Sequence, residues 1–194
     1  MLEYIAVLAG VSLFGLQHSG MSALSIKSRI IDRWGKKGFS RLYTLTSVTT
    51  ITVAFLSMWF WDWLYLILRP NEINLLLLIA GILFGGLGAI IAIRASAIIS
   101  VSTVADMRTD RVPELITDGL YSRIRHPLYL ATILLLIALA LIYPFPRVIT
   151  FAIGLMGYTM IGAYLEERKL IIHYGEEYLN YKKQAGFLLP HIRV

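Results

Sequence analysis

Arginine, histidine and glutamate residues lie at the ends of two neighbouring apolar segments of this chain. Arg125, His126 and Pro127 begin one segment, and Glu166 and Glu167 follow the next. Proline suits the first turn of a helix, where its missing N–H is harmless. The free amides of that turn, beside guanidinium and imidazole groups, could bind a carboxylate or a phosphate. The alternative is an ordinary basic flank that anchors the segment among lipid head groups.

The acidic pair requires partners of its own. Two adjacent carboxylates at the end of an apolar helix are costly unless they meet positive groups or water. Successive helical residues point about 100° apart. We therefore expect one member of the pair to face the other helices and its neighbour to face water. The alternative is a helix end that is simply neutralised by the adjacent Arg168 and Lys169.

The segments that position these groups are those of a membrane protein. Of the 194 residues, 57% are hydrophobic and only 15% are charged. The mean hydropathy of +0.69 lies outside the range of soluble domains. We therefore expect an all-α integral membrane protein whose chemistry uses helix ends and short loops. The absence of cysteine excludes disulfides, thiolate metal ligands and cysteine nucleophiles.

Five apolar stretches are candidates to cross a bilayer, which takes about 20 helical residues. They are residues 2–16, 42–64, 73–93, 128–143 and 148–165. The first lacks a basic leading region and carries Glu3, so we expect a retained helix rather than a signal peptide. The expected organisation is one membrane domain over residues 1–194. Three spans fall in residues 1–100, and two spans with a loop and a C-terminal helix fall in residues 101–194.

Basic residues favour one side of these stretches. Of the 18 lysines and arginines, all except Arg69 and Arg147 fall in segments on the same side as the C-terminus. Because retained positive charge marks the cytoplasmic side, the pattern predicts an outside N-terminus and a cytoplasmic C-terminus. Attraction of these residues to anionic lipid accounts for the net charge of +6 without nucleic acid.

Turn and packing signals indicate how the helices associate. The Pro144-Phe145-Pro146 connection is so short that the last two stretches must run antiparallel, side by side. It predicts that His126 and Glu166 are neighbours at one membrane face. Small residues at four-residue spacing predict close helix approach in the third stretch. They are Gly81, Gly85, Gly88 and Ala92.

The remaining polar segments identify no ligand by themselves. Residues 101–122 are too polar to cross lipid and are long enough to fold over both motifs as a lid. Tyrosines recur at helical spacing in the C-terminal tail, a pattern more typical of packing or an interface belt than of a cofactor wall. They are Tyr174, Tyr178 and Tyr181. The four histidines, His18, His126, His173 and His191, show no paired ligand spacing, so no metal site is expected.

Taken together, the motifs resemble the isoprenylcysteine carboxyl methyltransferase family. The resemblance covers residues 115–190, in order and at the spacing of that family, and residues 1–100 add only a compatible topology. The matching segments are residues 115–121, 125–129, 166–167, 174–183 and 189–190. Each segment is weak alone, and the set is specific.

The resemblance implies a methyltransferase embedded in the membrane that uses S-adenosylmethionine (SAM) and methylates a lipophilic or lipidated acceptor, with the carboxylate of a prenylated cysteine as the example. It implies a cofactor pocket built from the loop, helix ends and the C-terminal helix. The implied cofactor contacts are Leu115, Ile116, Tyr121, His126, Pro127, Tyr129 and Glu166. Arg125 and Glu167 are our candidates for catalytic residues.

Within this hypothesis, each polar group has an expected role. His126 would hold the methionyl carboxylate, Glu166 the ribose or ammonium group, and Glu167 would orient the acceptor or carry a proton. Two positions depart from the family pattern. Pro113 stands where members often have histidine, and Gly162 stands where the prenylcysteine-methylating enzymes have an arginine associated with the acceptor carboxylate. Arg125 and Arg168 are the candidates to substitute for that arginine.

Three other classes remain open at this point. A reductase similar to the sterol reductases would use NADPH, although such chains are about twice as long. A haem-binding anchor would use His18 and His126. A small transporter would show polar residues in mid-span and internal repeats, whereas the charges here gather at helix ends.

Overall fold

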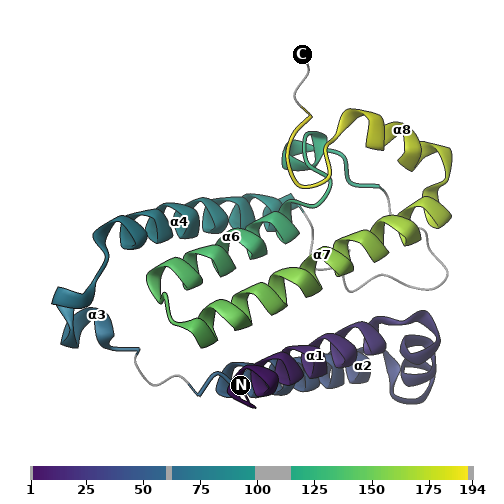
Figure 1. The fold of residues 1–194 in the computed structure, drawn as a ribbon. Helices are drawn as coiled ribbons and strands as arrows, with labels where there is room; N and C mark the ends of the chain where they lie inside the picture. The colour runs from purple at the N-terminus through teal and green to yellow at the C-terminus, as the bar shows by residue number, and fades with distance from the viewer. Residues whose placement is uncertain (1, 60–62, 99–114, 192–194) are drawn as a thin grey trace. The chain divides into compact units, whose positions relative to one another are not determined.

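The computed structural model describes residues 2–59, 63–98 and 115–191, and these residues are almost entirely helical (Figure 1). The α-helices are α1 (Leu2–Ser22), α2 (Leu24–Leu56), α3 (Tyr65–Leu68), α4 (Leu75–Ile98), α6 (Pro127–Ile142), α7 (Pro146–Tyr174) and α8 (Glu176–Gln184). Two 3-10 turns, η1 (Pro70–Glu72) and η2 (Gly119–Ser122), complete the elements. No strand occurs within these ranges. The expected all-α class is confirmed.

Three of the described helices are long and apolar enough to cross a membrane: α1, α4 and α7. Helix α6 is apolar but shorter, at 16 residues. The second expected stretch, residues 42–64, has different limits in the structure. Helix α2 begins at Leu24 and ends at Leu56, after which Trp59 adopts a φ of 47° and the chain leaves the helix. The basic residues between the first two stretches are therefore part of α2.

The structure divides into two compact units. The first comprises Met1–Gly81 and Leu139–Leu155, and the second comprises Ile82–Ala138 and Met156–Val194. The polar residues expected to form the site all lie in the second unit. The single-domain organisation expected from the sequence remains a prediction.

In the first unit, α1 and α2 run antiparallel and side by side (Figure 1). A Cβ atom added at Gly10 would lie 2.9 Å from the Ala54 Cα, so the two backbones nearly touch there. Further along, Gln17 donates to Thr46 at 2.7 Å and accepts from Thr50 at 3.1 Å. Interhelical hydrogen bonds and small residues of this kind hold helices together in lipid, where no hydrophobic force does so.

Replacing Gly10 by alanine is expected to destabilise the α1–α2 pair. The new methyl group would lie 2.8 Å from the Ser57 Oγ and 2.9 Å from backbone, so the helices must separate. Overpacking of this kind costs about 1–3 kcal/mol, which thermal unfolding in detergent would measure. Gly20→Ala is the matched control, because nothing lies within 4 Å of its Cβ position. Equal stability of the two variants would contradict the close approach.

In the second unit, small residues of α4 lie against α6. A Cβ at Gly88 would lie 3.1 Å from the Ala131 carbonyl oxygen, and one at Gly85 would lie 3.4 Å from the Ala138 Cβ. These two glycines therefore pack as the sequence predicts. Pro127 starts α6, and its side chain is fully buried.

Candidate active site

The beginning of α6, the end of α7 and the C-terminal tail meet in the second unit. Gly175 separates α7 from α8 with a φ of +53°, a left-handed conformation that glycine adopts readily. The chain can therefore turn between these helices. Two tyrosines of α8, Tyr178 and Tyr181, are buried together with Ala185, and Leu115 packs against them.

The tail after α8 pairs with the residues that precede α6. Gly186 donates from its backbone to Arg123 at 2.9 Å and accepts from the Arg125 amide at 2.8 Å, and the His126 amide donates to Phe187 at 3.2 Å. This short ladder includes the parallel bridge between Ile124 and Gly186. Only glycine fits at position 186, because any Cβ there would collide with the Leu189 carbonyl.

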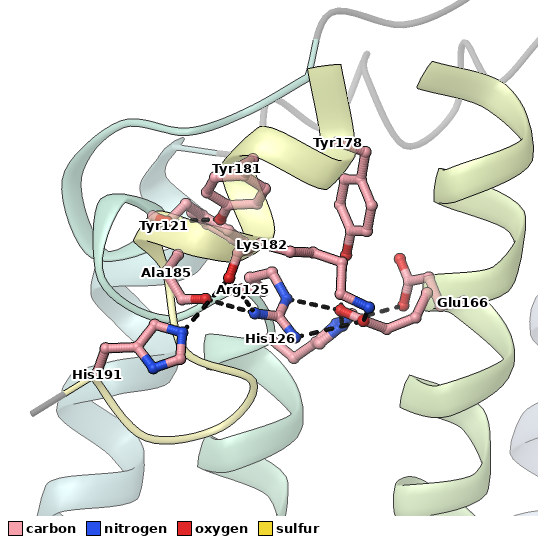
Figure 2. A network of polar contacts seen from close by, with 10 residues as sticks. Tyr121, Arg125, His126, Glu166, Tyr178, Tyr181, Lys182, Ala185 and His191 are labelled. Carbon is pink, nitrogen blue, oxygen red and sulfur yellow. Dashed lines mark hydrogen bonds and ion pairs between the residues drawn. The ribbon is translucent and has the colours of Figure 1, made fainter. Parts of the chain in front are cut away.

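The carboxylate of Glu167 is the centre of the site. Its oxygens accept from Arg125 Nε at 2.7 Å, from Tyr178 Oη at 2.7 Å and from Lys182 Nζ at 2.8 Å. His126 Nε2 lies 3.1 Å away. Figure 2 shows these donors converging from the start of α6 and from α8. Four side chains therefore stabilise the ionised carboxylate within an otherwise buried environment.

All three guanidinium nitrogens of Arg125 donate hydrogen bonds to other groups of the site. Its side chain is only 7% exposed, and Nη1 donates to the Ala185 carbonyl as well as to Lys182 O at 3.4 Å. The guanidinium carbon lies 5.8 Å from the centroid of the Phe187 ring. The arginine thus joins α6, α7 and the tail, and its donors are directed at protein groups.

His126 lies between the two glutamates. Its side chain is 3% exposed, with Nε2 on Glu167 and Nδ1 4.0 Å from Glu166 Oε2. The rings of Tyr129 and Phe187 contact the imidazole edge-on, with centroids 5.5 and 5.0 Å away. Because Glu167 holds Nε2, the Nδ1 side of the ring faces Glu166, with no hydrogen bond at that distance.

The two glutamates differ in exposure as the helical geometry requires. The Glu167 side chain is 7% exposed, whereas that of Glu166 is 38% exposed. One member of the acidic pair therefore faces inward and the other faces outward, as expected. The expected proximity of His126 to the acidic pair, 37 residues beyond Tyr129 in the chain, is also present in the structure.

Burial keeps the tyrosines of the site protonated. It raises the pKa of Tyr121 to about 12, with smaller contributions from Glu166 and Tyr181. Burial also raises the pKa of Tyr181 to about 12. The pKa of Tyr178 is raised by burial and then by its hydrogen bond to Glu167. These hydroxyls are therefore donors near neutral pH, and Tyr181 uses its own on the Tyr121 carbonyl at 2.5 Å.

The other cofactor contacts expected from the sequence differ in how deeply they are buried. Tyr121 and Pro127 are buried, Tyr129 lies against the imidazole, and Leu115 and Ile116 are half-buried. Of the lid expected over residues 101–122, residues 101–114 lie outside the described residues, and Pro113 is among them. Sequence reasoning assigned no role to Lys182, Ala185 or Phe187. Lys182 lies four residues after Tyr178 in α8, and this helical spacing is a signal that could have identified it.

These features define a class of protein: an integral membrane protein whose charged, buried site is built from helix ends and the C-terminal tail. A profile of the phospholipid methyltransferase family matches residues 76–177. Because this is more than half of the chain, the protein belongs to that family. The family assignment confirms the expected membrane methyltransferase class, and it favours methyl transfer over the reductase, haem-anchor and transporter alternatives.

The chain also resembles two curated proteins along most of its length. The methanethiol S-methyltransferase of Pseudomonas deceptionensis is 29% identical over 195 residues, covering 94% of this chain and 71% of the relative. That of Pseudomonas sp. (strain GM41(2012)) is 28% identical over 199 residues, covering 93% and 70%. No solved structure gives a significant match. Both relatives, like the family, are methyltransferases.

Proposed function

We propose that this protein transfers the methyl group of SAM to a small, uncharged thiol. The similarity to two methanethiol S-methyltransferases along 93–94% of the chain carries the choice of acceptor. The prenylcysteine carboxylate suggested by the motifs is the competing acceptor. The two classes differ in charge, so the cations at the site bear on the choice.

The residues around His126 suit the polar end of SAM. That end carries an ammonium and a carboxylate, and the buried imidazole beside the partly exposed Glu166 offers one group for each. The ring of Tyr129, edge-on to the imidazole, and the buried ring of Tyr121 are candidates to contact the adenosyl part. When bound, SAM supplies a methyl group already activated on a positively charged sulfur. The main task of the protein is then to position the reactants.

The cations of the site are not arranged for an acceptor carboxylate. Arg125 is directed at Glu167 and tail carbonyls, and Arg168 is exposed. At Gly162, where the prenylcysteine-methylating enzymes have arginine, a Cβ would lie 3.4 Å from the Tyr129 ring. An uncharged thiol requires no such cation, which supports the proposed acceptor class.

The proposed reaction balances with a single proton released. A bond forms between the acceptor sulfur and the methyl carbon, the bond from that carbon to the SAM sulfur breaks, and the thiol proton is lost. Glu166 is better suited than Glu167 to receive this proton, because the Glu167 oxygens already accept from four side chains. Water at the partly exposed Glu166 side chain would carry the proton away.

The test compares methyl acceptors in separate reactions with methyl-labelled SAM and the purified protein in detergent. Methanethiol, longer alkyl thiols, N-acetyl-S-farnesylcysteine and phosphatidylethanolamine would be supplied in parallel. We expect label in thioethers, with little in the farnesylcysteine ester or the lipid. Label only in the ester or lipid would overturn the acceptor assignment. Failure to label any acceptor, with SAM binding absent, would overturn the proposed function itself.

A further inference from the structure

The first part of α2 is a separate helical segment attached to the end of a membrane helix. Helix α1 ends at Ser22, and α2 begins at Leu24. Within α2, Gly35 has φ 69° and ψ 173°, which breaks the helix. Lys27 Nζ lies 5.8 Å from the Phe39 ring, whereas 12 residues of straight helix would separate them by about 18 Å. The segment therefore folds back at Gly35.

Exposed apolar and basic side chains occupy this folded segment. Ile26 is 41% exposed and Trp34 is 56% exposed. Ile26, Ile30 and Trp34 recur at four-residue intervals and so share a face. Arg29 and Arg33, also four residues apart, flank that face and are exposed. A tryptophan and aliphatic face bordered by arginines is the arrangement of helices that lie in a membrane interface.

Residues 24–41, which include the folded segment, carry a strongly positive net charge. Between residues 24 and 41 the only acidic residue is Asp32, against six basic residues: Lys27, Arg29, Arg33, Lys36, Lys37 and Arg41. Within the described ranges, the four exposed cations of this set, Arg29, Arg33, Lys37 and Arg41, form no ion pair with a carboxylate. Burial, and then the charge of Lys36, lower the pKa of Lys27. Four exposed cations are therefore crowded here without a carboxylate partner.

We infer that residues 24–41, named here the basic segment, dock on the anionic phospholipid head groups of the leaflet that contains the end of α1. The chain meets that surface at the end of α1, and Ile26 and Trp34 would enter the interface. Arg29, Arg33, Lys37 and Arg41 would pair with the lipid phosphates. This surface is in the first unit and does not depend on the proposed methyl transfer.

The test measures lipid binding by the full-length protein in detergent micelles. Native mass spectrometry and thermal unfolding would be followed on addition of phosphatidylglycerol or phosphatidylcholine. We expect phosphatidylglycerol to bind and stabilise preferentially, and about 1 M NaCl, where the Debye length is about 3 Å, to remove the preference. Equal effects of the two lipids, a preference that persists at high salt, or equal stabilisation by inorganic phosphate would overturn the inference.

Two variants separate charge from folding. Arg29→Gln/Arg33→Gln/Lys37→Gln/Arg41→Gln should weaken phosphatidylglycerol binding by at least about tenfold, because each basic residue contributes to the attraction. Arg29→Lys/Arg33→Lys/Arg41→Lys keeps the charge and should keep the preference. Undiminished binding by the first variant would count against the basic segment. The salt dependence of the wild-type protein decides the question if that variant does not fold.

Discussion

Glu167→Ala is expected to lose both stability and methyl transfer. The substitution leaves the Arg125 guanidinium, 7% exposed, without its carboxylate, and it removes the acceptor for Tyr178, Lys182 and His126. Removing one partner of a buried ion pair costs about 3–5 kcal/mol, because an uncompensated charge remains. That is a large share of the 5–15 kcal/mol typical of folded proteins. Thermal unfolding in detergent and labelled-SAM turnover would measure the two losses.

Glu166→Ala is the matched control for stability. The two residues are adjacent and chemically identical, but the Glu166 side chain is 38% exposed and its carboxylate lies 4.0 Å from His126 Nδ1, too far for a hydrogen bond. We expect its unfolding temperature to stay close to that of the wild type, whereas SAM turnover falls. Glu167→Gln should lie between wild type and Glu167→Ala in stability, since an amide keeps the shape but not the charge. Equal destabilisation by Glu166→Ala and Glu167→Ala would show that the carboxylate network does not hold the site together.

The second large effect is expected for His126→Ala, on SAM binding. The imidazole is the buried group between the two glutamates, and Glu167 fixes its orientation through Nε2. Hydrogen bonds to charged groups contribute about 1.5–3 kcal/mol, which corresponds to about ten- to hundredfold in Kd. Equilibrium binding of labelled SAM would measure the loss. A folded variant with wild-type SAM affinity would place the cofactor elsewhere.

His173→Ala controls for the removal of an imidazole. His173 is exposed near the end of α7, where its ring contacts Tyr174 at 5.4 Å. This variant should bind SAM and turn over as the wild type does. If both variants lose binding equally, the effect belongs to the helix end rather than to the site. Circular dichroism of each variant would establish that the helices remain formed.

The proximity of the two motifs could be predicted because the reason for it is local. Pro146 begins α7 four residues after α6 ends at Ile142, so the chain must reverse in that interval. Any antiparallel pair with so short a connection returns the end of α7 to the start of α6. The break inside α2 was less predictable, because it depends on one glycine at φ 69° within a helical pattern. Local hydrophobicity does not reveal such a break.

Residue types and their order alone determined that this is a helical membrane protein, that its charged groups gather at helix ends and that one glutamate of the pair must face inward. Only the tertiary structure decided that the inward residue is Glu167, that Arg125 is held by that carboxylate, and that the tail from Ala185 to Phe187 lies against Arg125 and His126. The 100° step between residues sets their relative directions. The rotation of α7 about its axis depends on its packing, and the tail pairing joins residues about 60 positions apart, so neither is encoded by local pattern.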